Sequence, residues 1–131
     1  MARRAVRGLP TFYPGLSYRD AQAAIGWLER AFGFEELLVV PGPGGLVTHA
    51  ELRFGNGVLM LGSLRDGEPA AQRQRAPYVY VADADAHHER ARAAGAEIVV
   101  PPHDHDYGGR GYTARDLEGN EWSFGSYRPA L

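Results

Sequence analysis

Apolar residues follow a helical period in one early segment of the chain. Between residues 21 and 32 they recur at the spacing that places them on one helix face: Ala24, Ile25, Leu28, Ala31 and Phe32. Asp20 stands at the N-cap position, where its carboxylate accepts hydrogen bonds from amides of the first turn. Gly33 follows in the usual position of a C-terminal glycine. The pattern predicts an amphipathic helix over residues 21–32.

Strand-forming segments surround this helix. Thr11–Tyr18 precedes it and is rich in aromatic residues, although Pro14 and Gly15 interrupt it. Three further strands follow, separated by turns of glycine, proline and asparagine: Glu35–Val40, Leu46–Phe54 and Val58–Leu61. The first half of the chain therefore has the predicted order β, α, β, β, β.

The second half repeats this order. A strand at Tyr78–Val81 leads to a helix that Asp83 or Asp85 caps and that runs through Ala94, with Gly95 as its stop. The remaining strands are separated by a long polar loop at 101–109 and a turn at 116–120: Glu97–Val100, Gly111–Arg115 and Glu121–Tyr127.

The two halves also share residues. Positions 28–31 (LERA) match 88–91 (HERA), and positions 39–41 (VVP) match 99–101, both at an offset of 60 (89 − 29 and 99 − 39). Two matches at one offset, with the same element order, indicate an internal duplication. We expect a first βαβββ module at 10–62, a linker at 63–77 and a second module at 78–129, together forming one domain.

Composition limits the possible functions. The chain has 131 residues, a formal net charge of −2 and no cysteine. The charge gives no electrostatic reason to expect nucleic acid or an acidic membrane as a partner. No apolar run approaches the roughly 20 residues that a transmembrane helix needs. The absence of cysteine excludes disulfides and thiolate metal sites, and it fits the reducing cytoplasm that we expect for this protein.

Two motifs resemble those of the vicinal oxygen chelate superfamily, which includes glyoxalases, bleomycin-resistance proteins and dioxygenases. One is the strand, aspartate and helix that ends in the sequence Ala-Phe-Gly-Phe at 31–34. The other is the closing sequence Arg-Asp-Leu-Glu-Gly-Asn-Glu-Trp at 115–122, in which Leu117 stands where the family has proline. The stretch 106–112 is similar to the glycine-arginine loop of the bleomycin-resistance branch. The resemblance spans about residues 10–129.

This resemblance implies an α+β fold in which two tandem βαβββ modules curl into incomplete barrels. The helix of each module covers the convex face, and the concave faces form the binding or active cavity. Members of the family usually form homodimers, often by exchanging modules, so we expect a homodimer here.

Enzymes of the superfamily hold a divalent metal at set positions on the concave face. Counting seven residues back from Asp20 and from Asp83 gives Tyr13 and Ala76, and counting three forward from Asn120 gives Ser123. None of these side chains replaces histidine or carboxylate in a site for a hard metal ion. The resemblance therefore predicts no cofactor at the usual positions, and a metal would need ligands elsewhere.

Strand alternation sorts the residues that line the expected cavity. Apolar residues such as Leu52, Val79 and Trp122 should face the helices. The side chains between them should then face the cavity or its rim, which gives these candidate ligand-binding residues: Tyr13, His49, Glu51, Arg53, Tyr78, Tyr80, Arg110, Thr113, Arg115 and Ser123. Aromatic walls with a few polar anchors suit a small organic ligand. Alternatively, Glu51 pairs with Arg53 or Arg115 on a sheet that faces solvent.

Two histidine groups suggest further chemistry. His49, beside Glu51, is the candidate general base for metal-free catalysis. The run from His103 to Asp106 contains possible metal ligands, but its position in a loop favours a solvated, mobile segment.

The leading hypothesis is a protein that binds and sequesters an antibiotic or aromatic metabolite, without the family's metal site and without catalysis. The alternative is a glyoxalase-like lyase, isomerase or dioxygenase that acts through His49 or through an unrecognised metal site. A third possibility is a dimerising scaffold that lacks an open cavity.

Overall fold

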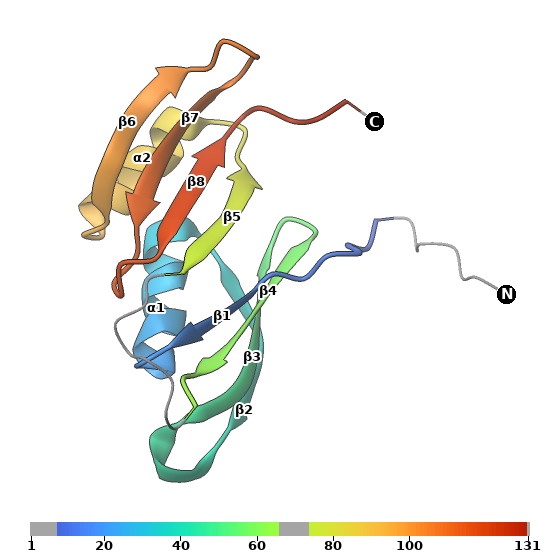
Figure 1. Cartoon of the computed structure of the whole chain (residues 1–131), viewed down its shortest axis with the longest axis vertical. Helices are drawn as coiled ribbons and strands as arrows, with labels where there is room; N and C mark the ends of the chain where they lie inside the picture. The colour runs from blue at the N-terminus through green and yellow to red at the C-terminus, as the bar shows by residue number, and fades with distance from the viewer. Residues whose placement is uncertain (1–7, 66–73, 131) are drawn as a thin grey trace, which may run out of the picture.

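A computed structural model describes residues 8–65 and 74–130 of the chain, and it confirms the α+β fold of two tandem modules. Each module is an open four-stranded sheet with one helix packed on one face (Figure 1). The strand order is β1-β4-β3-β2 in the first sheet and β5-β8-β7-β6 in the second, so the two sheets have the same topology. The first and fourth strands of each module pair in parallel, and the other pairs are antiparallel.

The first module follows the predicted order closely. Its elements are β1 (Gly15–Tyr18), α1 (Ala21–Phe32), β2 (Glu35–Pro41), a short 3-10 turn (Pro43–Gly45), β3 (Val47–Phe54) and β4 (Gly57–Ser63). The Asp20 carboxylate accepts a hydrogen bond from the Ala23 amide at 3.1 Å, and Gly33 ends the helix in the left-handed conformation. Both predicted caps of α1 are therefore confirmed. The first strand is shorter than predicted, because Thr11–Pro14 lies outside it.

The second module contains β5 (Arg75–Tyr80), α2 (Ala84–Ala93), β6 (Glu97–Asp104), β7 (Arg110–Arg115) and β8 (Glu121–Gly125). Asp83, rather than Asp85, caps α2 by accepting from the Ala86 amide at 3.0 Å. The caps Asp20 and Asp83 therefore act identically in the two copies, as the duplication predicts.

Two predicted boundaries in the second module were wrong, and both involve proline. The strand β6 continues through Pro101 and Pro102 to Asp104, where the sequence predicted a loop. The strand β5 begins at Arg75, inside the predicted linker, and includes Pro77. Both are edge strands with register shifts beside their prolines, so the missing amides break no sheet hydrogen bond. The central part of the predicted linker, 66–73, lies outside the described residues.

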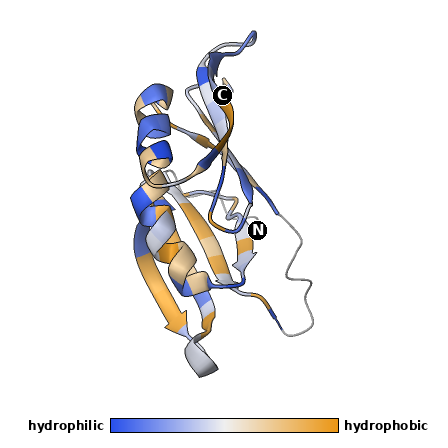
Figure 2. Cartoon of the chain, turned by 90° about the vertical axis from the view of Figure 1, so that its left-hand side faces the viewer, coloured by the Kyte–Doolittle hydropathy of each residue, from blue (hydrophilic) through white to orange (hydrophobic). Residues whose placement is uncertain are grey.

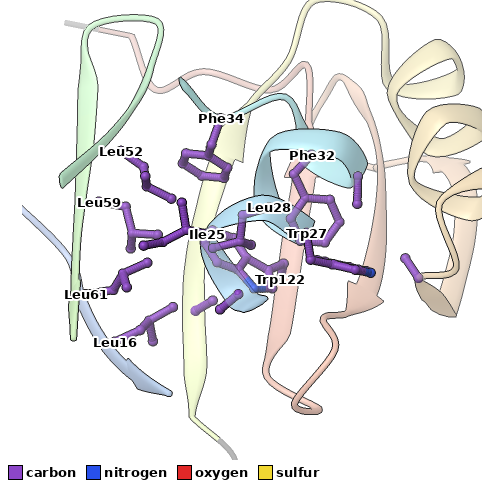
Figure 3. Packing of buried hydrophobic residues seen from close by; sticks show 14 of the residues in the cluster. Leu16, Ile25, Trp27, Leu28, Phe32, Phe34, Leu52, Leu59, Leu61 and Trp122 are labelled. Carbon is purple, nitrogen blue, oxygen red and sulfur yellow. The ribbon is translucent and has the colours of Figure 1, made fainter. Parts of the chain in front are cut away.

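One hydrophobic core joins the two modules. The helix α1 directs Ile25 and Leu28 towards the first sheet, while Phe32 lies among aromatic side chains of the second module (Figure 3). The Phe32 ring lies 5.5 Å from Trp122 and 4.6 Å from Phe124, measured between centroids. Trp122 and Phe124 are fully buried, which confirms their assignment to the apolar face of β8. A core of this kind holds the modules of one chain together.

The two helices lie one after the other along the same side of the molecule, and α2 is the more hydrophilic (Figure 2). Side chains of α2 cap the C-terminal end of α1. The Arg90 guanidinium donates to the carbonyls of Glu29 and Arg30, each at 2.9 Å. The His87 Nε2 lies 2.8 Å from the Phe32 carbonyl. These bonds satisfy carbonyls that a helix end otherwise leaves unpaired. Neither described helix is long and apolar enough to cross a membrane.

Candidate functional site

Strand alternation in the second sheet separates a buried face from an open one. Tyr112 and Trp122 point to the helix side and are buried. Thr113 and Ser123, which face each other across the β7–β8 ladder, point to the opposite side. Their hydroxyl oxygens lie 3.1 Å apart and form a hydrogen bond. This pair is the polar floor of a hollow on the open face.

Aromatic rings form the wall of this hollow. The Tyr78 hydroxyl donates to the Tyr127 carbonyl at 2.8 Å, and the Tyr127 ring meets the Tyr107 ring edge-on at 4.9 Å. The Tyr107 ring stacks on His105 at 4.8 Å with an interplanar angle of 8°, and His103 meets His105 edge-on at 4.7 Å. The five rings come from three separate parts of the second module and support one another.

The hollow has a volume of about 540 Å³, within the usual range for small-molecule sites. Its lining residues are Tyr78, His103, His105, Tyr107, Tyr112, Thr113, Ser123, Phe124 and Tyr127. The Tyr78 phenol is partly buried, and this burial raises its pKa, so the hydroxyl stays protonated at neutral pH. The lining is thus aromatic, with hydroxyl and imidazole groups as its polar part.

Three glycines allow the rings to approach the backbone. A Cβ at Gly111 would lie 2.7 Å from the His105 ring and 2.8 Å from the Phe124 carbonyl oxygen. A Cβ at Gly125 would lie 2.8 Å from the Tyr78 hydroxyl. Gly109, with a φ of +77°, leaves no room for a Cβ beside the Tyr127 backbone, which would be 2.6 Å away. The position of the aromatic wall therefore depends on these glycines.

The segment His103–Asp106 was predicted to lie in a loop, but its first two residues belong to β6. His103 lies at the end of β6, and the His105 amide donates to the Gly109 carbonyl at 2.9 Å, which closes the following turn. Both imidazoles line the hollow. Sequence reasoning also missed Tyr107 and Tyr127 as lining residues. The sequence feature that could have indicated these lining residues is the presence of aromatic residues on both sides of the Gly108-Gly109 turn.

The candidate residues of the first module lie on the open face of β3. His49 Nε2 and Glu51 Oε2 are 2.9 Å apart, and Arg53 donates to Glu35 at 2.6 Å. The alternative pairing of Glu51 with Arg53 or Arg115 is therefore wrong, because each arginine has a glutamate on the neighbouring edge strand. None of these residues lines the hollow of the second module.

The remaining candidate ligand-binding residues lie at the margin of this hollow or elsewhere in the molecule. Arg115 donates to Glu97 at 2.5 Å beyond the hollow. Arg110 points to the helix side, where it bonds Asp85 at 2.9 Å and Asp104 at 3.3 Å, so it joins β7 to α2 and β6.

The two remaining tyrosines lie outside the aromatic hollow. Tyr80 lies under the guanidinium of Arg128, 3.6 Å from its ring centroid. Tyr13 is exposed and precedes β1.

A larger hollow of about 1040 Å³ lies between the modules of the chain. It is bounded by the β3–β4 turn, by β5 with the start of α2, and by residues before β1. Tyr80, His87 and Arg128 are among its lining residues. Tyr80 was predicted to face the cavity between concave faces, whereas it lines this space between the modules.

The residues at the family's usual metal positions do not fit a metal ion. Tyr13 is exposed, Ala76 has no ligand atom in its side chain, and the Ser123 hydroxyl bonds Thr113. Within residues 8–65 and 74–130, no three histidine, aspartate or glutamate side chains lie close enough to hold a metal together. The side chains at these three positions therefore provide no imidazole or carboxylate donor for a divalent metal.

Comparisons with known proteins place this geometry in context. The family model described as "Glyoxalase/Bleomycin resistance protein/Dioxygenase superfamily" matches residues 12–124. The structure of TioX from Micromonospora sp. ML1 is 37% identical over 89% of this chain and 99% of that one, with a TM-score of 0.75. No curated protein sequence matches the chain.

Two more distant structures share the fold. TnmS3, an antibiotic binding protein from Streptomyces sp. CB03234, is 21% identical over 95% of this chain and 96% of its own, with a TM-score of 0.71. A lactoylglutathione lyase from Agrobacterium tumefaciens is 24% identical over 88% of this chain and 93% of its own, with a TM-score of 0.64. Proteins with this fold thus include both a binding protein and an enzyme.

Proposed function

We infer a function from one premise, that the chain belongs to the glyoxalase/bleomycin resistance protein/dioxygenase superfamily. We propose that it binds and sequesters a small aromatic molecule, an antibiotic or an aromatic metabolite, without a metal ion. The observation that carries this proposal is the aromatic hollow of the second module, in which five rings surround the Thr113–Ser123 hydroxyl pair. The antibiotic-binding TnmS3 has the same fold, which is consistent with the proposal.

Aromatic rings at this density favour binding over catalysis. An offset or edge-on aromatic pair contributes about 0.5–1.5 kcal/mol beyond its buried area, so contact with two or three rings adds about 1–4.5 kcal/mol to the free energy gained by burying the ligand. The rings are already held by one another and by the Tyr78–Tyr127 hydrogen bond, so little ordering is needed when a ligand enters. Among the described lining residues there is no carboxylic acid.

Calorimetric titration of the purified protein tests the proposal. The ligands are bleomycin and an anthracycline as aromatic antibiotics, with an aminoglycoside as a compound without aromatic rings. Replacing Tyr107 with alanine should weaken binding of an aromatic ligand at least tenfold, because Tyr107 contacts both His105 and Tyr127. Leu117→Ala, in an exposed turn outside the hollow, is the matched control. Equal affinity in both variants would place binding elsewhere.

We also propose that the protein is a homodimer, with or without exchange of modules, in which a second copy covers the open face of the first sheet. Leu38 and Val40 of β2 support this, because they are 44% and 38% exposed on the strand beside His49 and Glu51. Light scattering after size-exclusion chromatography should give twice the chain mass. The change Leu38→Glu should dissociate the dimer, whereas Leu46→Glu, at a similarly exposed leucine before β3, should not. A monomeric wild-type protein would contradict this part.

One observation favours a second candidate, metal-free catalysis. The 2.9 Å contact between His49 and Glu51 orients the imidazole as a carboxylate orients a general base. This function would be a glyoxalase-like lyase or isomerase reaction. A turnover assay with hemithioacetal substrates, repeated with His49→Ala, tests it. Turnover that the substitution does not change would remove His49 from the reaction.

A further inference from the structure

The polar groups in the aromatic hollow are all neutral side chains or imidazoles. Among the described residues, no carboxylate, ammonium or guanidinium group lines it. Two arginines of β7 form ion pairs outside it: Arg115 bonds Glu97, and Arg110 bonds Asp85 on the helix side. Glu121 lies on the same face one step further along β8, beyond the lining residues.

From this lining we propose a ligand class, which rests on the function proposed above. The hollow selects planar aromatic molecules that carry a ring hydroxyl or carbonyl group, and it discriminates against aromatic anions. An anion that leaves water needs a cation or several strong hydrogen bonds, and the described lining supplies no ammonium or guanidinium group. An uncharged hydroxyl needs only one or two neutral partners.

The floor of the hollow provides those partners. In the 3.1 Å contact between Thr113 and Ser123, one hydroxyl donates and the other accepts, so the accepting hydroxyl keeps its own proton for a ligand. The Tyr78 hydroxyl donates a hydrogen bond to the Tyr127 carbonyl, and its oxygen lone pairs can accept a hydrogen bond from a ligand. The hollow thus presents both a donor and acceptors to one polar substituent of a ring.

The Tyr78 phenol remains uncharged near neutral pH, because partial burial raises its pKa. His103 and His105 are the imidazole side chains in the wall, and the Tyr107 ring stacks on His105. A protonated imidazole would attract an anion, so the experiment is run at about pH 8, above the ordinary pKa of imidazole.

The test uses three naphthalene probes with the purified full-length protein. They are 2-naphthol, 2-methylnaphthalene and the anion 2-naphthoate, titrated by fluorescence and calorimetry. We expect 2-naphthol to bind about fivefold to tenfold more tightly than 2-methylnaphthalene, because of the hydrogen bonds at the floor. The 2-naphthoate anion should bind at least tenfold more weakly than 2-naphthol.

Two variants test whether the hydroxyl groups at the floor of the hollow cause the preference for 2-naphthol. The change Thr113→Val removes one hydroxyl and should bring the 2-naphthol affinity down to that of 2-methylnaphthalene, which should itself not change. Ser123→Ala should act in the same direction. Thr48→Val, at an exposed threonine of the first module, is the matched control and should change neither affinity.

The outcomes separate the two proposals. If 2-naphthoate binds as tightly as 2-naphthol, or if Thr113→Val and Ser123→Ala leave the preference for 2-naphthol intact, the ligand class is wrong while aromatic binding stands. If none of the three probes binds, the proposed binding function of this hollow fails, and the ligand class fails with it.

Discussion

The Tyr18 phenol donates a 2.7 Å hydrogen bond to the Oδ2 atom of Asp116, which joins the first strand of one module to the closing turn of the other. Asp116 is only 6% exposed. The same oxygen accepts from Asn120 Nδ2 and Trp122 Nε1, and its partner Oδ1 accepts from the amides of Glu118 and Asn120. This explains why the closing sequence contains aspartate, asparagine and tryptophan at these spacings: they form one buried hydrogen-bond cluster.

Replacing Tyr18 with phenylalanine should lower the free energy of unfolding by about 1–3 kcal/mol, because the buried carboxylate loses one of its donors. Burial and the Asp116 carboxylate both raise the pKa of Tyr18 well above its usual range, so the lost group is a neutral donor. Urea unfolding followed by tryptophan fluorescence measures the change. Tyr13→Phe, at an exposed tyrosine, is the control. Equal stability of both variants would show that the bond between modules contributes nothing.

Replacing Gly109 with alanine should destabilise the second module and weaken ligand binding. The new Cβ would lie 2.6 Å from the Tyr127 amide nitrogen, and neither backbone segment moves without displacing the aromatic wall. Gly44→Ala is the matched control, since Gly44 has a similar positive φ of +68° but no neighbour within 4 Å. Backbone strain alone costs about 1 kcal/mol in each variant. We expect the Gly109 variant to lose more than this in thermal unfolding, and to lose aromatic binding as well.

Acidification should destabilise the protein through His87. Burial, followed by the positive charge of Arg90, lowers the pKa of this imidazole below its ordinary 6.5, although the hydrogen bond to the Phe32 carbonyl opposes the shift. The unfolded chain therefore binds the proton first, so this contribution to stability is present above pH 6.5 and is lost as the pH falls towards the native pKa. The Nδ1 atom faces the Tyr112 hydroxyl at 2.6 Å.

Urea unfolding between about pH 7.5 and 5.5 measures this loss, a window in which imidazole is the main titrating side chain. The variant His87→Gln should show a flatter dependence of stability on pH, while His103→Gln, at an exposed histidine, should follow the wild type. A variant at His87 that declines as steeply as the wild type would contradict the assignment.

Removal of divalent metal should leave ligand binding unchanged. The residues Tyr13, Ala76 and Ser123 provide no set of ligands for such an ion. Titration of an aromatic ligand before and after dialysis against a chelator, and again after addition of zinc or nickel, should give one affinity. A loss of affinity that metal restores would reveal a metal site formed by other residues.

The sequence by itself determined the local elements and the division into modules. Periodicity at Ala24–Phe32 and the caps Asp20 and Gly33 predicted α1 correctly, because these signals act between residues close in the chain. Alternation also placed Trp122 and Phe124 on the buried face of β8 and Thr113 and Ser123 on the open one. Of the tyrosines predicted to line the cavity, Tyr78 does so.

Only the tertiary structure decided which distant side chains meet. Tyr127 and His105 reach one wall because the Tyr127 backbone lies against Gly109 and the His105 ring lies against Gly111, a convergence that no spacing along the chain encodes. The prolines of β6 were misread as a loop, because a missing amide matters only in a strand that has neighbours on both sides. The partners of Arg53 and Arg115 also differed from the prediction, because each arginine bonds a glutamate on a neighbouring strand. Local patterns specify an element, but pairing between strands specifies the neighbours of each side chain.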